Sequence, residues 1–407
     1  MIAVPKHRYI FAAVSAVIFI ISGILPLNMV ASAVNWNVLM MLTGTMCTVS
    51  FFIDSKMPNR IADWLLNISP NVMWVAVLLS LFAGIVSAFV DNVATVLMIA
   101  PVGIALSKKL DISPVKLLIC ISVSSNLQGA ATLVGDTTSI LLGGYAGMNF
   151  MDFFFMNGKP SIFWAVEIGA LVTIPIIMNI FRDQRQPVMK VELTEVEDYL
   201  PSILLILNIL LLIAASFLPV KPENINGIIC LAVAGAGFIH ALKSRDYAAV
   251  MRTFYNLDYQ TLILLAGLFI IIGGITEVGI IDRISALFLK AGGSSVFIMY
   301  TIIVWASVLI SAFIDNIPYV AALLPVVTGI AANMGCSPIL FDFGLLVGAT
   351  LGGNITPVGA SANIAAIGIL RKNEYEVKNS DFLGIGLPFT LVAVLSGYLF
   401  CWFVWKP

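Results

Sequence analysis

The stretch SAFVDNVATVLMIAPV, residues 87–102, decides how this chain folds, because it returns as SAFIDNIPYVAALLPV at residues 311–326. Eight of the sixteen positions are identical, including the Asp-Asn pair at 91–92 and 315–316. At the shift that carries position 87 onto 311, LQGAATLVGDTTSI (127–140) also aligns with LGGNITPVGASANI (351–364). The chain is therefore a duplication in which an acidic phrase and a Gly/Thr/Ser-rich phrase keep one fixed spacing.

The composition is that of a polytopic membrane protein, since 60% of the 407 residues are hydrophobic and 11% are charged. Segments long enough to cross a hydrocarbon core of about 30 Å occur at residues 9–27, 36–53, 161–181, 200–219, 224–242, 259–281 and 383–405. A net charge of −1 argues against a nucleic-acid partner. The chain has only two histidines, and its five cysteines are scattered, which argues against a metal centre, a His-based triad and a disulfide framework.

Four further apolar tracts are interrupted by polar residues. Asp-Asn interrupts residues 71–107 and 295–333, and Gly-rich polar stretches interrupt 114–149 and 341–370. A backbone break at membrane depth needs protein or water around it, because lipid offers no partner to the freed N–H and C=O groups. We therefore expect two re-entrant helical hairpins, 71–107 and 295–333, and two transmembrane helices unwound at mid-membrane. An alternative topology, in which each hairpin crosses the membrane fully twice, gives the same distribution of Lys and Arg between the two sides.

Nine crossings and two hairpins place sixteen of the 21 Lys and Arg residues on one side and five on the other. The positive-inside rule then puts the N-terminus in the cytoplasm and the C-terminus outside an inner (plasma) membrane. On this count residues 1–181 and 200–407 form an inverted repeat, joined by a cytoplasmic linker at 182–199. Residues 59–68 are expected to form an interfacial amphipathic helix. A signal peptide ending near residues 31–33 is the alternative for the first apolar run.

The candidate ion- or substrate-binding groups lie at the hairpin tips and in the unwound spans. Half-helix ends and loosened backbone there present carbonyls, amides and carboxylates to a cation, or helix N-termini to an anion. Glycines let the backbone approach a ligand closely. The candidates are Asp91, Asn92, Asn126, Thr132, Gly135, Asp136, Thr137, Asp315, Asn316, Asn354, Thr356, Gly359, Ser361 and Asn363. We expect neither a catalytic residue nor a cofactor.

The carboxylates Asp91 and Asp315 carry most of this prediction. A carboxylate near mid-membrane needs a cation, a proton or a buried partner, and no Lys or Arg lies within either phrase. Asp136 has no acidic counterpart, because Ala360 stands at its repeat position, and so it offers a charge off the symmetry axis. For the hydroxyl side chains, capping of the broken helices explains their presence equally well.

These phrases, together with GATLGGNITPVGASANI (348–364), resemble the ion transporter superfamily. The branch concerned contains ArsB-type arsenite permeases, NhaD-type sodium/proton antiporters and the melanosomal P protein, has a citrate transporter-like domain and is related to the divalent anion/sodium symporters. The resemblance spans nearly the whole chain and implies a scaffold, a moving transport part, homodimerisation and elevator-like alternating access. It also implies that Asn92 and Asn316 lie at paired ion or substrate sites, where sodium is a possible ligand.

The tips depart from the symporters, which carry Ser-Asn-Thr where this chain has Asp-Asn-Val at 91–93 and Asp-Asn-Ile at 315–317. We therefore expect a secondary active transporter of a small inorganic ion or solute and not an enzyme, with proton or sodium coupling through Asp91, Asp315 and, as a further candidate, Asp136. Arsenite or antimonite efflux and sodium/proton exchange are both compatible with these residues. A sodium-coupled carboxylate symporter is the alternative, and a passive channel or an intramembrane aspartyl protease is more remote.

Overall fold

The computed structural model describes residues 7–109, 112–188, 190–220, 222–281, 283–285 and 295–407. These residues are helical apart from loops and one hairpin of two short strands, β1 (Phe155–Met156) and β2 (Lys159–Pro160). The expected helical membrane protein is thus confirmed, with this hairpin as an addition. Within the described residues, seven helices are long and apolar enough to cross a membrane: α3 (Trp36–Asp54), α6 (Asn92–Lys109), α9 (Ile162–Ile180), α11 (Ile225–Lys243), α13 (Tyr259–Glu277), α16 (Asn316–Asn333) and α19 (Asn379–Trp405).

The helix boundaries repeat at the same shift as the sequence. The pair α5 (Val72–Ser87) and α6 corresponds to α15 (Val296–Ser311) and α16, and all four boundaries move equally (296 − 72, 311 − 87, 316 − 92 and 333 − 109 are the same). The first residues of α7 (Val115–Gly129) and α8 (Thr137–Ala146) are carried by this shift onto those of α17 (Ile339–Gly352) and α18 (Ser361–Lys372). The duplication in sequence is therefore a duplication of structure, and the two helix breaks fall where the Gly-rich phrases predict them.

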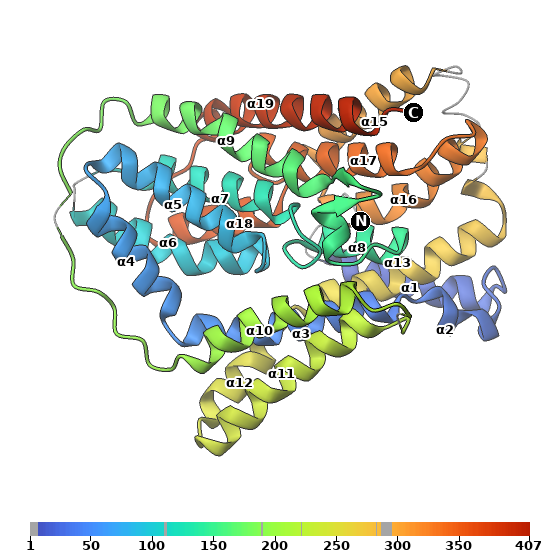
Figure 1. The fold of residues 1–407 in the computed structure, drawn as a ribbon, viewed down its shortest axis with the longest axis horizontal. Coiled ribbons are helices and arrows are strands. Elements are labelled where there is room, and N and C mark those ends of the chain that lie inside the picture. Colours follow the sequence, from blue (N-terminus) through green and yellow to red (C-terminus); the bar gives the residue numbers. More distant parts are fainter. Residues whose placement is uncertain (1–6, 110–111, 189, 221, 282, 286–294) are drawn as a thin grey trace.

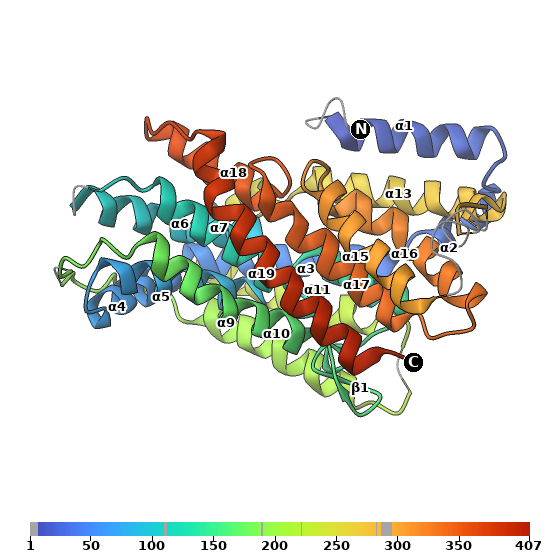
Figure 2. The same ribbon diagram turned by 90° about the horizontal axis from the view of Figure 1, so that it is seen from above.

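The two hairpins enter the molecule from opposite ends. Figures 1 and 2 share a horizontal axis, and in both α5 and α6 lie at one end while α15 and α16 lie at the other. Residues of both tips, Asp91 and Asn92 from one and Asn316 and Ile317 from the other, line one central cavity. Helix α5 packs on α7, and α15 packs on α17, so each hairpin lies against the broken helix of its own half.

A second group of helices packs through glycines. Helix α1 (Arg8–Ile21) lies along α13, and α3 lies along α11, with α10 (Leu200–Ser216) beside them. A Cβ at Gly44 would meet the Cys230 carbonyl carbon at 2.4 Å, and a Cβ at Gly267 would meet the carbonyl carbon of Ala12 at 2.8 Å. Small residues that bring backbones this close are typical of helix packing in membranes, where lipid removes the hydrophobic drive between helices.

Two expected spans are shorter in the structure. The run at 9–27 is helical only to Ile21, because Gly23 adopts a φ of +73° and the Ser22 N–H turns back to the Ile18 carbonyl at 2.9 Å. The 3-10 turn η2 (Leu27–Met29) and the short helix α2 (Val30–Ala33) follow. The run at 200–219 becomes the 17-residue α10. Each is shorter than the roughly 20 residues of a straight crossing.

The remaining expected spans, 36–53, 161–181, 224–242, 259–281 and 383–405, coincide within a few residues with α3, α9, α11, α13 and α19, and the expected interfacial helix coincides with α4 (Met57–Ile68). All five cysteines are free, and four of them are buried, where they pack as small apolar side chains.

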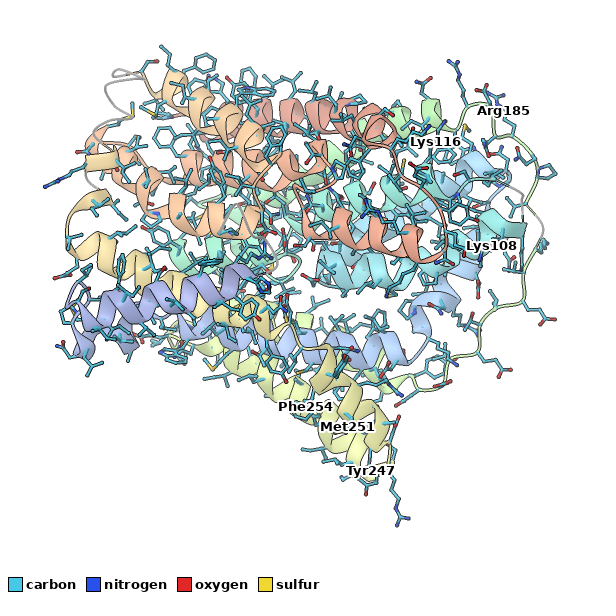
Figure 3. All side chains as sticks on the ribbon, turned by 180° about the vertical axis from the view of Figure 1, so that it is seen from behind. Lys108, Lys116, Arg185, Tyr247, Met251 and Phe254 are labelled. Carbon is cyan, nitrogen blue, oxygen red and sulfur yellow. The ribbon has the colours of Figure 1, made fainter. Side chains whose placement is uncertain are left out.

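Helix α12 (Tyr247–Asn256) is not among the predicted segments, since it lies between the expected spans 224–242 and 259–281. Its first turn is closed by Asp246, whose Oδ1 atom accepts a hydrogen bond from the Ala249 N–H at 2.9 Å. The helix projects from the body of the molecule, and Figure 3 shows Tyr247, Met251 and Phe254 along it. All three side chains are exposed, as in a helix that lies at a membrane interface.

Candidate functional site

The two tip carboxylates close the helices that follow them. The Oδ2 atom of Asp91 accepts hydrogen bonds from the N–H groups of Val93 at 3.0 Å and Ala94 at 3.2 Å, at the start of α6. The Oδ1 atom of Asp315 accepts one from the Ile317 N–H at 3.1 Å, at the start of α16. Both residues are therefore N-caps, and this capping is one reason for an Asp at each tip.

Asp315 also has a fixed cationic partner, which the sequence does not predict. The Arg8 Nη1 atom lies 2.5 Å from Asp315 Oδ2, and the Ser361 hydroxyl donates to the same oxygen at 3.1 Å. The charge count places Arg8 on the cytoplasmic side, whereas the structure places it at a hairpin tip. Asp91 and Asp315 occupy equivalent positions of the repeat but differ in their contacts, since Asp91 has no such ion pair among the described residues.

Three buried asparagines link the first tip to both broken helices. Asn92 Nδ2 donates to Asn126 Oδ1 at 3.0 Å, and Asn126 Nδ2 donates to the Thr350 carbonyl at 2.7 Å and to Asn354 Oδ1 at 3.0 Å. Asn354 Nδ2 continues the chain to the Val123 carbonyl at 3.0 Å. Asn126 and Asn354 thus join the first half of the molecule to the second, and both donors of Asn126 are already in use.

The unwound segments are held against the tips by the same contacts in both halves. Thr132 donates its hydroxyl hydrogen to the Ala88 carbonyl, and Thr356 does the same to the Ala312 carbonyl. Glycines make this approach possible, because a Cβ at Gly135 would lie 2.7 Å from the Ala88 carbonyl oxygen.

The second segment is closed in the same way and by one further amide. A Cβ at Gly359 would lie 2.9 Å from the Ala312 carbonyl oxygen. Asn363 Nδ2 donates to the carbonyls of Gly353 at 3.0 Å and Thr356 at 3.2 Å. The contacts of Thr132, Gly135, Thr356, Gly359 and Asn363 shape the breaks, and none of the five lines the central cavity.

The central cavity has a volume of about 340 Å³ and carries an acidic lining. Six of the predicted residues line it: Asp91, Asn92, Asp136, Thr137, Asn316 and Ser361. Two more carboxylates, Asp54 at the end of α3 and Asp258 before α13, complete a set of four, and no Lys, Arg or His is among the described lining residues. A cavity with these groups attracts cations and disfavours anions.

Asp136 is the most enclosed of these carboxylates, at 3% exposure. The Thr138 hydroxyl donates to Asp136 Oδ2 at 2.8 Å and lies 3.0 Å from the Thr350 hydroxyl, so this acid contacts the second half through a chain of hydroxyls. No Lys or Arg pairs with it among the described residues. A carboxylate this deep in the molecule needs a proton or a cation to compensate its charge.

Asn316 presents the opposite chemistry in the same cavity. Its side chain is 3% exposed, and Nδ2 has no hydrogen-bond partner among the described residues. A buried amide without an acceptor is unfavourable, which points to a ligand oxygen or a water at this position. The cavity therefore combines carboxylates suited to a cation with one amide donor suited to an oxygen atom.

Asp54 and Asp258 are the carboxylates of the described lining that the sequence did not predict. Asp54 pairs with Arg252 Nε at 3.1 Å, and Asp258 Oδ1 accepts from the Thr261 N–H at 3.0 Å as the N-cap of α13. Each lies next to the end of a predicted span, where an acidic residue is common and indicates no binding site. Only the fold, which brings these span ends to the hairpin tips, shows that the two carboxylates line the cavity. In the described part of the chain, no three His, Cys, Asp or Glu side chains form a metal-binding cluster.

Sequence comparison identifies a family. A family model described as "Citrate transporter" matches residues 1–342. The chain is 30% identical over 382 residues to an uncharacterised transporter of Mycobacterium tuberculosis, MT2759, covering 91% of this chain and 87% of that protein. It is 25% identical over 451 residues to the human P protein, of which it covers 54%.

Two solved transporters share the fold. The YdaH transporter of Alcanivorax borkumensis superposes with a TM-score of 0.61 at 14% identity, covering 92% of this chain and 87% of that one. MtrF of Neisseria gonorrhoeae, described as one of a class of antimetabolite efflux pumps, gives a TM-score of 0.56 at 18% identity and covers 91% and 81%. At these identities the likeness concerns the fold alone.

Proposed function

The chain belongs to the citrate transporter family of secondary transporters, and from this premise we propose that it moves a small cation through the central cavity in exchange for protons or sodium. The observation that carries the proposal is the acidic lining of this cavity. Asp91 lies at the tip of the α5–α6 hairpin and Asp136 at the break between α7 and α8. The other two carboxylates, Asp54 and Asp258, lie at the end of α3 and at the start of α13. A cation bound there contacts carboxylates from both helix groups, so movement of one group against the other changes its coordination.

Sodium/proton exchange is the first form of this proposal. Asp136 has no cationic partner among the described residues, so either a proton or a sodium ion compensates its charge, and competition between the two couples their movements. Arsenite or antimonite efflux is a further possibility carried by the sequence resemblance, although no cysteine is among the described residues that line the cavity.

Carboxylate transport is the second candidate function, and two observations favour it. The family model bears the description "Citrate transporter", and the unpartnered Nδ2 atom of Asn316 offers a donor to a ligand oxygen. With four carboxylates in the wall, a carboxylate substrate needs accompanying cations to enter.

A flux assay tests these alternatives. Purified protein in liposomes is given an imposed proton or sodium gradient, and uptake of sodium-22, arsenite and citrate is compared, the last with and without Mg²⁺. We expect saturable, proton-gradient-driven sodium uptake. Flux of all three substrates without saturation would indicate a channel and refute the transporter proposal.

Orientation, oligomeric state and movement are part of the same proposal. Lys108, Lys116 and Arg185 gather at the end of the molecule where the α5–α6 hairpin has its base (Figure 3), which supports a cytoplasmic location for that end under the positive-inside rule. The α1–α13 and α3–α11 pairs then form a scaffold, suited to a homodimer. The hairpins with α7, α8, α17 and α18 form the part that moves in an elevator-like cycle.

A further inference from the structure

A buried carboxylate lies outside the central cavity and was not singled out in the sequence. Asp342 stands in the first turn of α17 and is 3% exposed, and its Oδ1 atom has no hydrogen-bond partner among the described residues. Ten residues separate it from Gly352, the end of α17, which is about 15 Å along a helix axis. It has no repeat counterpart, because Leu118 stands at the corresponding position (342 − 118 equals 311 − 87).

Asp342 lines a separate cavity of about 230 Å³. Tyr145 and Thr328 contribute hydroxyl groups to its lining, and no Lys, Arg or His is among the described lining residues. This volume accommodates an ion and several waters at about 30 Å³ per water. The cavity therefore holds a carboxylate, two hydroxyl side chains and, from the described residues, no compensating positive charge.

The small cavity adjoins a larger one of about 790 Å³, since Tyr145 and Met148 line both. Glu223 is the charged residue among the described lining of the larger cavity. The two cavities therefore share part of their walls, and the charged side chains among the described residues of both linings are acidic.

The cavity lies where the two halves of the molecule meet. Tyr145 belongs to α8 in the first half, and Thr328 and Asp342 belong to α16 and α17 in the second, and these three helices pack on one another. The N-terminal end of α17 carries the positive end of the helix dipole, which favours an ionised carboxylate in the first turn. A cation held between these residues ties α8 to α16 and α17.

We propose that Asp342, Tyr145 and Thr328 form a second cation site, for a monovalent cation such as sodium. A carboxylate and hydroxyls are hard oxygen ligands of the kind that alkali and alkaline-earth cations prefer, and a single carboxylate suits one positive charge. The site is independent of the transported species and does not rest on the proposed function. It binds an ion that stabilises the packing of the two halves.

The test is the melting temperature of the purified full-length protein in NaCl, KCl and choline chloride at equal ionic strength. We expect sodium at a concentration of about 100 mM to raise it by about 2 °C or more over choline, because a ligand that binds only the folded state stabilises it. Sodium bound in the central cavity would also raise the melting temperature, so Asp91→Asn/Asp136→Asn serves as the background for the test. This double variant retains a rise, and adding Asp342→Asn to it abolishes that rise, which separates the site from the central cavity. Glu167→Gln, which removes a carboxylate from α9, is the matched control and retains the rise.

Three results would overturn the proposal: equal melting temperatures of the wild type in sodium and choline, a rise that disappears in Asp91→Asn/Asp136→Asn, or a rise that survives when Asp342→Asn is added to that double variant. Should Asp342→Asn fail to fold, Tyr145→Phe/Thr328→Val removes two ligand oxygens and keeps the carboxylate. That variant is expected to shift the half-saturating sodium concentration upward about tenfold, which is about 1.4 kcal/mol of binding free energy. An unchanged midpoint would exclude the two hydroxyls as ligands and overturn the site as proposed.

Discussion

At the scale of single residues, Asp91 and Asp315 show how a repeated residue acquires two roles. Each caps the helix after its tip, and this shared contact explains why both copies carry an Asp. Asp91 lines the acidic cavity, whereas Asp315 forms an ion pair with Arg8. Arg8 places a cation at one of two tips that carry the same Asp-Asn pair, so the two tips differ in their local charge.

Arg8→Ala is therefore expected to destabilise the protein by about 1–3 kcal/mol, less than the cost of breaking a fully buried pair, because the Arg8 side chain is 23% exposed. Thermal unfolding of Arg8→Ala, Asp315→Asn and the double variant measures the coupling, since Asn retains the cap. The double variant should lose less than the sum of the single variants. Strict additivity would mean that the ion pair contributes nothing.

The sequence predicted the tip residues because polar groups inside apolar runs are costly and conspicuous. It did not predict the pairing of Arg8 with Asp315, because the two residues belong to opposite halves of the chain and no local pattern connects them. Asp258 was not predicted as a lining residue for a similar reason. An Asp before a helix is expected as an N-cap, and only the fold shows that this one also lines the cavity.

At the scale of elements, the breaks in the two long helices depend on glycines that no other residue replaces. A Cβ at Gly135 would lie 2.5 Å from the Gly129 carbonyl oxygen, and a Cβ at Gly359 would lie 2.6 Å from that of Gly353. Each segment folds back on its own helix end and is pressed against a hairpin tip. The breaks are thus fixed by close backbone contact at the glycines together with the side-chain hydrogen bonds of Thr132, Thr356 and Asn363.

Gly135→Ala and Gly359→Ala are each expected to cost about 1–3 kcal/mol through overpacking against backbone that cannot move aside. Gly368→Ala is the matched control, because a Cβ at that position in α18 meets nothing within 4 Å, and it should be neutral or stabilising. Melting temperatures of the three variants decide the matter. A tolerated Ala at both 135 and 359 would contradict the tight packing of the breaks.

Element boundaries could be predicted where composition changes sharply, and less well elsewhere. The hairpins and breaks were placed within a few residues because Asp-Asn and Gly-rich phrases interrupt apolar runs. Helix α12 was missed because its charged surroundings resemble a loop, although Tyr247 and Met251 lie exposed along one side of it. The early end of α1 depends on the positive φ of Gly23, which hydrophobicity does not reveal.

At the scale of the whole molecule, the opposed hairpins and the charge distribution predict a topology that labelling can check. Single cysteines replacing Lys190 in the linker and Lys159 at the start of β2, in a background without the five native cysteines, should react with an impermeant maleimide from opposite sides of the membrane. Labelling of both from the same side would refute the inverted repeat. The control is a cysteine at Asp183, which shares the linker and should behave as Lys190 does.

The central claim is that cations pass through the acidic cavity between the two tips. Sodium-22 uptake into proteoliposomes under an outward proton gradient tests it in the wild type, in Asp91→Asn/Asp136→Asn and in Asp183→Asn, whose wild-type side chain is 90% exposed in the linker. We predict gradient-driven uptake in the wild type and the linker variant. In the double variant we predict a loss of at least about tenfold, or about 1.4 kcal/mol. Wild-type uptake by a folded double variant would contradict the account.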